Sequence, residues 1–152
     1  MLPPALQSVW FVPHVVTYFV AYAGLGISAV LAVMALFKYY VSGNKLAVGP
    51  IPMEDMTNKA TILGFVCLSF GLAMGAAWGK SAWGEYWAWD PKENWAFITW
   101  LAYLAYLHTR LLPSWRGPKA MWLNVACFAA VLFTYLGMHL LPTASDSMHV
   151  YQ

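Results

Sequence analysis

"SAWGEYWAWDPKENWAF", residues 81–97, is the stretch that decides the fold. It carries four tryptophans, one tyrosine and one phenylalanine among three carboxylates and one lysine, while the chain on either side is nearly uncharged. Charged groups are costly inside a bilayer, and tryptophan is enriched at its surfaces. The stretch therefore predicts a segment at a membrane surface, between two apolar segments.

The composition agrees with a membrane protein. Of the 152 residues 61% are hydrophobic and 9% are charged, against about a quarter charged in a soluble domain. Cys67 and Cys127 both fall inside apolar runs, so we expect two buried thiols rather than a disulfide. The chain contains no CxxC motif. The lipid bilayer is thus the expected surroundings of the chain, and we expect no nucleic-acid partner.

Four stretches approach the roughly 20 apolar residues that a helix needs to cross the hydrocarbon core. Internal repeats and low-complexity linkers are absent from the sequence. We therefore predict an all-α, polytopic membrane protein with a single domain, 1–152, and a Trp-rich external loop between its second and third helices. The four predicted transmembrane helices are 15–40, 60–78, 95–112 and 120–141.

Lysine and arginine are unevenly distributed between the two sides of this topology. The side with both termini and the aromatic loop holds Lys80 and Lys92, whereas the other side holds six basic residues. Cytoplasmic loops carry the excess of basic residues. The termini and the Trp-rich loop are therefore predicted to lie outside the cytoplasm.

The aromatic stretch also contains a helix start. Asp90 suits an N-cap, Pro91 suits the first helical position, and Glu93 is placed to close a capping box. The tryptophans have two interpretations: an interfacial belt, or a platform for a flat apolar ligand. A belt scatters its rings over all helix ends, whereas four of the nine tryptophans here fall between residues 78 and 89. This clustering favours the platform.

The chain has four histidines: His14, His108, His139 and His149. On the predicted topology three of them lie at the outer face, level with the aromatic loop, and His108 lies near the inner end of the third span. Ionisable residues within a span are costly and often functional. Since imidazole is a good ligand for haem iron, all four are candidate ligands.

Three segments carry a family resemblance. "WGEYWAWD", residues 83–90, matches the WGxxWxWD (WWD) motif of the haem-handling proteins of cytochrome c maturation. Residues 91–110 resemble the CcsA/ResC branch, which is the integral membrane part of the system II cytochrome c synthase. Residues 6–22 and 133–152 resemble the family segments that carry the two external histidines. The domain as a whole thus resembles the C-terminal core of that family.

The resemblance implies haem b as both transported substrate and bound cofactor. His14 would be one external axial ligand. The second would be His149 or His139, and "SMHVY" around His149 fits the family context better. His108 matches the intramembrane histidine that helps to hold a second haem, whose opposing ligand comes from a partner in the family.

The resemblance also implies a function. The protein would bind haem, transport it and present it on the external side of the membrane, where the thiols of an apocytochrome c CxxCH segment add to the vinyl groups. The chain would be a component of a cytochrome c synthase (haem lyase), with no catalytic residue assigned. The aromatic groups expected to lie against the porphyrin are Trp83, Tyr86, Trp87 and Trp89. At the rim, Asp90, Glu85 or Lys80 would contact the propionates or the apoprotein.

Members of the family usually have more spans ahead of the first external histidine. We therefore expect the chain to work as one half of a larger assembly, with a missing N-terminal half or a membrane partner similar to ResB/CcsB. The expected location is a bacterial inner membrane or a thylakoid-type membrane.

Three other functions fit parts of the sequence. A four-helix electron-transfer subunit would need histidine pairs facing each other within the bundle. A structural membrane subunit would have incidental histidines. A haem exporter or chaperone would share the tryptophan motif, so the sequence does not separate it from a synthase.

Overall fold

The computed structural model describes residues 3–43, 52–137 and 140, and these residues are all helical or loop. The all-α prediction is confirmed. Four long helices make up most of the described structure. In chain order the elements are η1 (Pro4–Gln7), α1 (Phe11–Val41), α2 (Met53–Trp83), α3 (Pro91–Thr109), η2 (Pro113–Trp115), α4 (Pro118–Leu132) and η3 (Phe133–Gly137), the last a π-helical turn.

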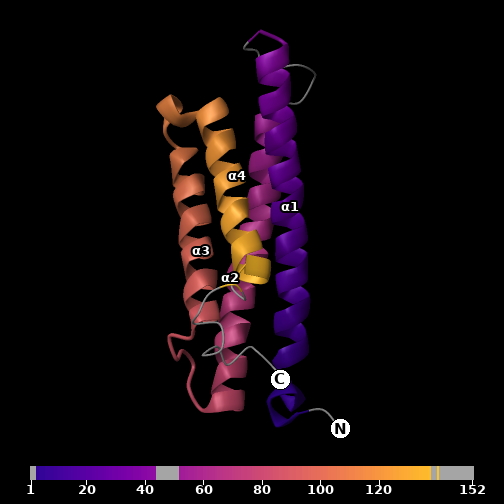
Figure 1. Cartoon of the computed structure of the whole chain (residues 1–152), viewed down its shortest axis with the longest axis vertical. Helices are drawn as coiled ribbons and strands as arrows, with labels where there is room; N and C mark the ends of the chain where they lie inside the picture. The colour runs from indigo at the N-terminus through magenta and orange to yellow at the C-terminus, as the bar shows by residue number, and fades with distance from the viewer. Residues whose placement is uncertain (1–2, 44–51, 138–139, 141–152) are drawn as a thin grey trace.

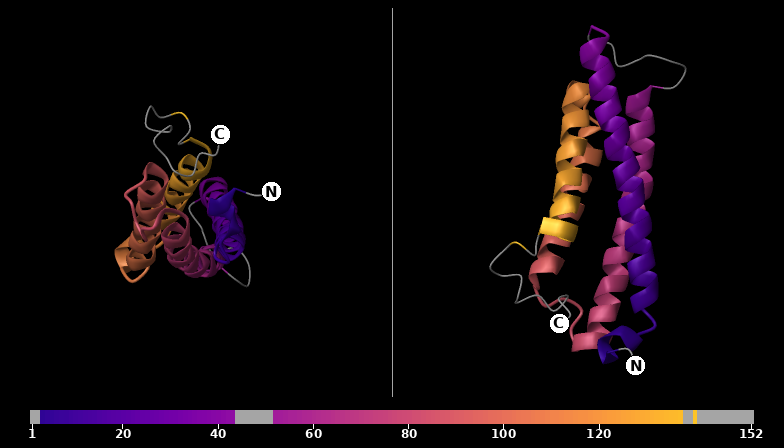
Figure 2. Two further views of the ribbon diagram at one scale, coloured as in Figure 1. Left: turned by 90° about the horizontal axis from the view of Figure 1, so that it is seen from below. Right: turned by 45° about the vertical axis from the view of Figure 1, so that its right-hand side comes forward.

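The four long helices alternate in direction and form a bundle (Figures 1 and 2). Contacts join α1 to α2, α2 to α3, α3 to α4, and α4 back to α1. As a result, the start of α1 and the α2–α3 loop lie at one end of the bundle, which we call the loop end, and the shorter α4 points toward that end but stops before it. The turn between α3 and α4 lies at the opposite end (Figure 1).

Three helices are long and apolar enough to cross a membrane: Phe11–Val41, Met53–Trp83 and Pro118–Gly137. The third predicted span, 95–112, is not among them. α3 begins with the polar residues Lys92, Glu93 and Asn94 and ends at Thr109, so its apolar part is short. The prediction of four transmembrane helices is therefore supported for three of them by length and composition.

α2 extends beyond the predicted second span, 60–78, at both ends. α2 begins at Met53, directly after Pro52, with two acidic residues in its first turn, which the positive end of the helix dipole favours. It continues to Trp83 and ends at Gly84, whose φ of 85° is the left-handed conformation common at a helix C-terminus. The first three residues of the aromatic stretch are thus helical, and the loop proper is 84–90.

The other predicted boundaries need smaller corrections. α1 already begins at Phe11, ahead of the predicted span. α4 ends at Leu132 and continues as η3 to Gly137, and the predicted end of this span, at residue 141, lies outside the described residues. The π-helical turn widens the backbone there, as is frequent near functional sites.

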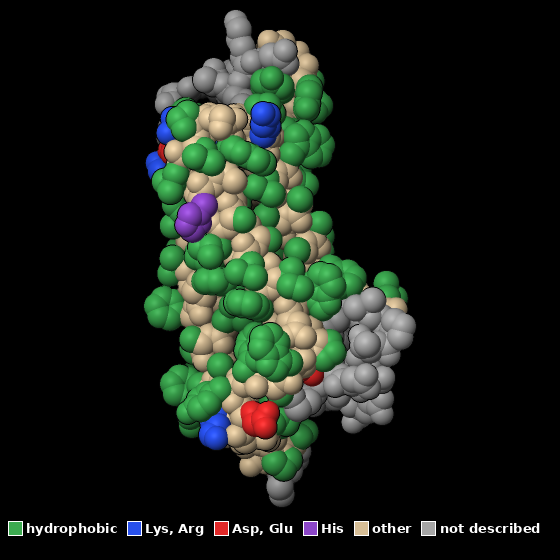
Figure 3. All heavy atoms as spheres, turned by 90° about the vertical axis from the view of Figure 1, so that its left-hand side faces the viewer, with side chains coloured by type: hydrophobic (Ala, Val, Ile, Leu, Met, Phe, Trp, Pro, Cys, Tyr) green, Lys and Arg blue, Asp and Glu red, His purple; other side chains and the backbone are tan. Residues whose placement is uncertain are grey.

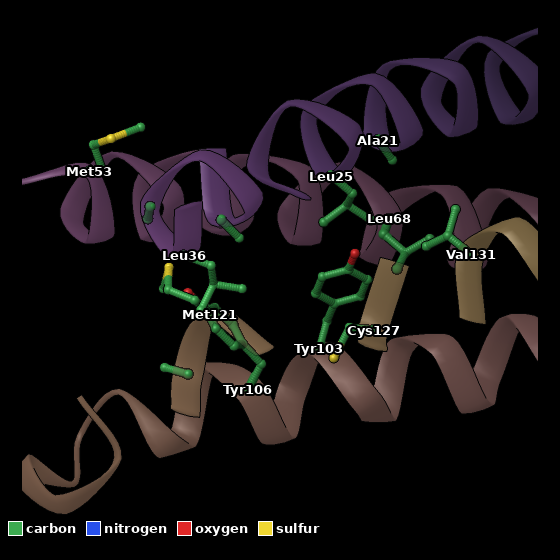
Figure 4. Close-up of a cluster of buried hydrophobic side chains, with 13 residues drawn as sticks. Ala21, Leu25, Leu36, Met53, Leu68, Tyr103, Tyr106, Met121, Cys127 and Val131 are labelled. Atoms are coloured by element: carbon green, nitrogen blue, oxygen red, sulfur yellow. The ribbon is translucent and has the colours of Figure 1, made fainter. Parts of the chain in front are cut away.

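Hydrophobic side chains from all four helices fill the interior (Figure 4). Leu25, Leu68, Tyr103 and Cys127 meet at its centre and are at most 2% exposed. α1 and α2 approach closely, since a Cβ on Gly64 would lie 2.8 Å from the Leu25 side chain. Close backbone approach at small residues is the usual way in which membrane helices associate.

A closed set of hydrogen bonds lies within this interior. Ser28 Oγ donates to Asn124 Oδ1 (2.9 Å), Asn124 Nδ2 donates to Thr61 Oγ1 (2.9 Å), and Thr61 Oγ1 donates to Ser28 Oγ (2.8 Å). All three residues are fully buried. Since polar groups in hydrocarbon are costly without partners, these bonds fix α1, α2 and α4 against one another.

The outer surface is mainly hydrophobic, with charged side chains near its two ends (Figure 3). At the end opposite the loop end, the Glu54 carboxylate of α2 pairs with Arg110 and also accepts from Gly117 N at 2.9 Å. The three helix termini that meet there are thus joined. Cys67 and Cys127 are both free thiols.

Candidate functional site

The start of α3 has the predicted cap. Asp90 Oδ2 accepts from Lys92 N at 3.0 Å, and Glu93 Oε2 accepts from Asp90 N at 3.2 Å, which completes the capping box. Glu93 Oε2 also accepts from Ala88 N at 3.0 Å. Asp90 is 4% exposed. The capping prediction is confirmed, and these bonds tie the aromatic loop to the first turn of α3.

Trp89 has a strained backbone. Its φ is 57°, in the left-handed region that bulky side chains rarely adopt. Its carbonyl accepts from Asn94 Nδ2 at 3.0 Å, and its ring meets the edge of Trp87 at 6.0 Å between centroids. Strain of this kind is often found at functional sites, where the surrounding structure holds it in place.

A cavity of about 220 Å³ lies at the loop end of the bundle. Its walls come from the start of α1, the end of α2, the aromatic loop, the first turns of α3, and η3. The lining is mostly aromatic and includes His14, Tyr18, Tyr22, Trp78, Tyr86, Trp87 and Tyr135.

His14 is held in the cavity wall by a contact between two helices. Its Nδ1 lies 2.9 Å from the carbonyl oxygen of Gly71. Because a carbonyl oxygen only accepts, Nδ1 carries the proton, and the acceptor of the neutral ring is Nε2. A backbone carbonyl on the second nitrogen is the arrangement in which metal-bound histidines are usually oriented.

Gly75 makes room for this imidazole. A Cβ built at residue 75 would lie 2.7 Å from His14 Cε1, closer than real contacts allow. The ring also stacks on Trp78 (5.5 Å between centroids, 25° between planes) and meets the edge of Tyr18 at 4.8 Å. Trp78 in turn donates from Nε1 to Ala5 O at 2.7 Å, which fixes η1 beneath the site.

The sequence did not predict most of the residues that line the cavity, among them Tyr18, Tyr22, Trp78 and Tyr135. A signal existed for two of them. His14, Tyr18 and Tyr22 are spaced four residues apart, so they share one face of a helix. Trp78 lies three residues after Gly75, one turn from the residue that contacts His14. Tyr135 carries no comparable signal, because its place depends on η3.

The predicted aromatic platform is divided in the structure. Tyr86 and Trp87 line the cavity. Trp83 instead packs on Trp78 at 4.9 Å between centroids, and Trp89 is 70% exposed. The four residues therefore do not form one flat wall; two line the cavity, one supports it and one projects from the loop.

The predicted iron ligands are not all brought together. His108 is exposed in the last turn of α3, and α3 carries it to the end of the bundle opposite His14 (Figure 1). Its Nδ1 lies 2.7 Å from Leu104 O. His139 and His149 lie outside the described residues. Within the described ranges His14 is the only histidine of the cavity.

The donor set suits a porphyrin better than a bare metal ion. Residues 3–43, 52–137 and 140 hold no cluster of three or more His, Cys, Asp or Glu able to bind a metal ion. Haem iron needs only one or two protein ligands, and an aromatic wall buries the ring. Since ligand pockets usually measure about 300–1,000 Å³, this cavity of about 220 Å³ would take one part of a porphyrin.

Comparison with known proteins identifies the family. The family described as "Cytochrome C assembly protein" matches residues 1–144. The chain is 40% identical over 153 residues to the cytochrome c biogenesis protein CcsA of Chlamydomonas reinhardtii, covering 99% of this chain and 42% of the relative. It is 38% identical over 166 residues to CcsA of Prochlorococcus marinus strain AS9601, covering 92% of this chain and 54% of the relative.

The chain therefore spans about half the length of the curated relatives it matches. The resemblance noted in the motif of residues 83–90 is confirmed over nearly the whole chain. This chain belongs to the cytochrome c assembly protein family.

Proposed function

We propose that this chain binds haem b in the cavity at the loop end and presents it for covalent attachment to an apocytochrome c. The observation that carries the proposal is the geometry of His14, whose Nδ1 is held by Gly71 O so that Nε2 is the ring's acceptor. The aromatic lining would bury the ring, and membership of a cytochrome c maturation family supports the choice of haem.

In this proposal all four helices cross the membrane, and the loop end lies outside the cytoplasm. The charges of the described residues support this orientation. Lys80 and Lys92 lie at the loop end, while five basic residues lie at the opposite end: Lys38, Lys59, Arg110, Arg116 and Lys119. The membrane would be a bacterial inner membrane or a thylakoid-type membrane.

The second external ligand is proposed to be His149, with His139 as the alternative. Thr134 and Tyr135 of η3 line the cavity, so the chain enters the segment that contains both histidines beside the proposed site. When bound, haem supplies the iron that the imidazoles ligate and the vinyl groups that accept cysteine thiols. The protein's part is to bind and orient it.

His108 is proposed to ligate a second haem near the cytoplasmic side. Its Nδ1 is bonded to Leu104 O, which makes Nε2 the acceptor on an exposed helix face. An opposing ligand would come from a partner similar to ResB/CcsB or from a further part of the same protein. The two histidines at opposite ends suggest a route for haem from the inner to the outer site. Synthase activity is proposed only for such an assembly.

An electron-transfer subunit with haem held inside the bundle is less well supported. That function requires histidines facing the bundle interior. The buried side chains of residues 3–43, 52–137 and 140 include no histidine.

The test is spectroscopic. The chain, with its partner where one is known, would be purified in detergent, and reduced and oxidised spectra recorded for the wild type, His14→Ala and His108→Ala. We expect a b-type haem spectrum that is lost or shifted in His14→Ala. Loss in His108→Ala alone would favour the electron-transfer subunit, and haem unchanged at the outer site in His108→Ala would contradict the route between the two sites.

A further inference from the structure

The cavity wall also contains a donor without an acceptor. Trp87 lines the cavity, and its indole Nε1 is buried with no hydrogen-bond partner among the described residues. The other buried polar atoms in that condition belong to residues that do not line the cavity: Asn58, Asn94, Tyr103, Tyr106 and Arg110. A buried N–H without a partner is costly, so it calls for an explanation, of which a bound ligand is one.

A cation lines the same cavity. Lys92, in the first turn of α3, is half-buried, and burial lowers the pKa of its ammonium group. The nearby Asp90 charge opposes this shift but has a smaller effect than burial. Glu93 also lines the cavity, and its carboxylate accepts from two backbone N–H groups. A partly desolvated ammonium favours an anionic partner.

Trp87 also borders a shallow hollow between α2 and α3, which Ser69, Phe97 and Trp100 line as well. The Ser69 hydroxyl already accepts from Trp100 Nε1 at 2.8 Å and donates to Phe65 O. Among the described residues, the only side-chain acceptor of that hollow is thus the Ser69 hydroxyl, which is already engaged and does not bond to the Trp87 N–H. Lys92 lines the cavity and not the hollow, so an anion in the cavity would meet a cation there, and an anion in the hollow would not.

We propose that Trp87 Nε1 and the Lys92 ammonium bind the carboxylate side chains of the porphyrin, and so orient it in the cavity. The proposal rests on the function proposed above. A carboxylate accepts from an indole N–H and an ammonium at once, which satisfies both groups. The consequence is specificity for a dicarboxylate ring. The vinyl-bearing side, which lies across the ring from the carboxylates, is directed away from this wall.

The test compares two probes with the same ring and vinyl groups: iron protoporphyrin IX, which carries two carboxylates, and its uncharged dimethyl ester. Each would be titrated into the detergent-solubilised full chain and followed by Soret absorbance. We expect the wild type to bind the free acid at least about tenfold more tightly than the ester, since hydrogen bonds to charged groups are the stronger kind.

Trp87→Phe keeps an aromatic side chain and removes the indole N–H. We expect it to weaken binding of the free acid by about tenfold and to leave binding of the ester unchanged. Trp100→Phe is the matched control, because Trp100 Nε1 already has Ser69 Oγ as its acceptor. Lys92→Gln should act in the same direction as Trp87→Phe. Its control is Lys80→Gln, since the Lys80 ammonium donates to Gly84 O and does not line the cavity.

Two results would overturn the proposal. Equal wild-type affinity for both probes would show that the carboxylates are not recognised, while leaving haem binding at His14 in place. Equal losses for acid and ester in Trp87→Phe, with Lys92→Gln unchanged, would show that Trp87 serves only as packing. Failure of the wild type to bind either probe would instead refute the proposed function itself.

Discussion

His14 and His108 hold their imidazoles by the same kind of bond in opposite surroundings. In each, Nδ1 lies within hydrogen-bond distance of a backbone carbonyl oxygen, 2.9 Å for His14 and 2.7 Å for His108. The His14 bond runs from α1 to Gly71 of α2, whereas the His108 bond stays within α3 and reaches the carbonyl four residues earlier.

The difference shows which histidine depends on the fold. The position of His14 in α1 depends on α2, because Gly71, Gly75 and Trp78 of α2 lie against its imidazole. It also depends on η1, since Trp78 donates to Ala5 O of that element. A change well away from the imidazole can therefore displace it. The His108 bond forms in any helix that contains it, and the exposed ring meets no other helix through that bond. His14 is thus oriented by contacts between helices, whereas His108 is oriented by a bond within its own helix.

The largest expected effect is a break at the His14 end by one added methyl group. In Gly75→Ala the new Cβ would lie 2.7 Å from His14 Cε1, so the imidazole must move away from α2 and lose its bond to Gly71. Loss of an orienting contact of this kind typically costs 10–100-fold in metal affinity. We expect a loss of at least about tenfold in haem binding by Soret titration.

The matched control is Gly26→Ala in α1. There the new Cβ would meet only the Phe128 ring at 3.5 Å, an ordinary contact. Gly26→Ala should bind haem as the wild type does. Equal haem affinity in the two alanine variants would mean that His14 does not need its place against α2, and the comparison between the two histidines would lose its basis.

The next effect concerns the opposite end, where Glu54 joins α2 to α3 and α4. The Glu54 and Arg110 side chains are 17% and 16% exposed, and Glu54 Oε1 also accepts from Gly117 N. Breaking a buried pair costs about 3–5 kcal/mol, and partial exposure reduces this, so Glu54→Gln should lower the free energy of unfolding by about 2 kcal/mol. Haem affinity at the loop end should stay unchanged.

The neighbouring residue provides the control for this prediction. Asp55 pairs with Lys59 at 2.8 Å, but those side chains are 49% and 71% exposed. Exposed pairs contribute about 0–1 kcal/mol, so Asp55→Asn should leave thermal unfolding in detergent nearly unchanged. If Glu54→Gln unfolded like Asp55→Asn, the Glu54–Arg110 pair would not stabilise this end of the bundle. If Glu54→Gln weakened haem binding, the two ends would not be independent.

The helices and the helix start at Asp90 were predictable because they depend on local order along the chain. Apolar runs of sufficient length predicted four helices, and Asp90, Pro91 and Glu93 predicted the cap that the structure contains. The span of α3 was less secure, since its polar first turn and its end at Thr109 leave a short apolar part. Helix ends at Met53 and Trp83 were missed because apolar runs do not mark where a helix emerges from hydrocarbon.

The site was only partly predictable, for a different reason. The motif of residues 83–90 placed its three tryptophans in one group, but helix geometry separates them: Trp83 ends α2 and packs on Trp78, while Trp87 lies in the loop. Tyr18, Trp78 and Tyr135 come from α1, α2 and η3, which meet only in the folded bundle. Contacts between distant elements carry no local pattern in the sequence, so these residues were not predicted.

The smallest expected effect sharpens the role of Asp90 at the loop end. Asparagine caps a helix about as well as aspartate, whereas alanine at an N-cap costs about 1 kcal/mol. Asp90→Ala should therefore lower the unfolding temperature by roughly 2–4 °C, and Asp90→Asn should leave it nearly unchanged. If the carboxylate serves only the Lys92 backbone N–H, Asp90→Asn should also bind haem as the wild type does. A variant Asp90→Asn of normal stability and weakened haem binding would instead assign the charge to the ligand, and the loop end would then recognise haem through its rim as well as through His14.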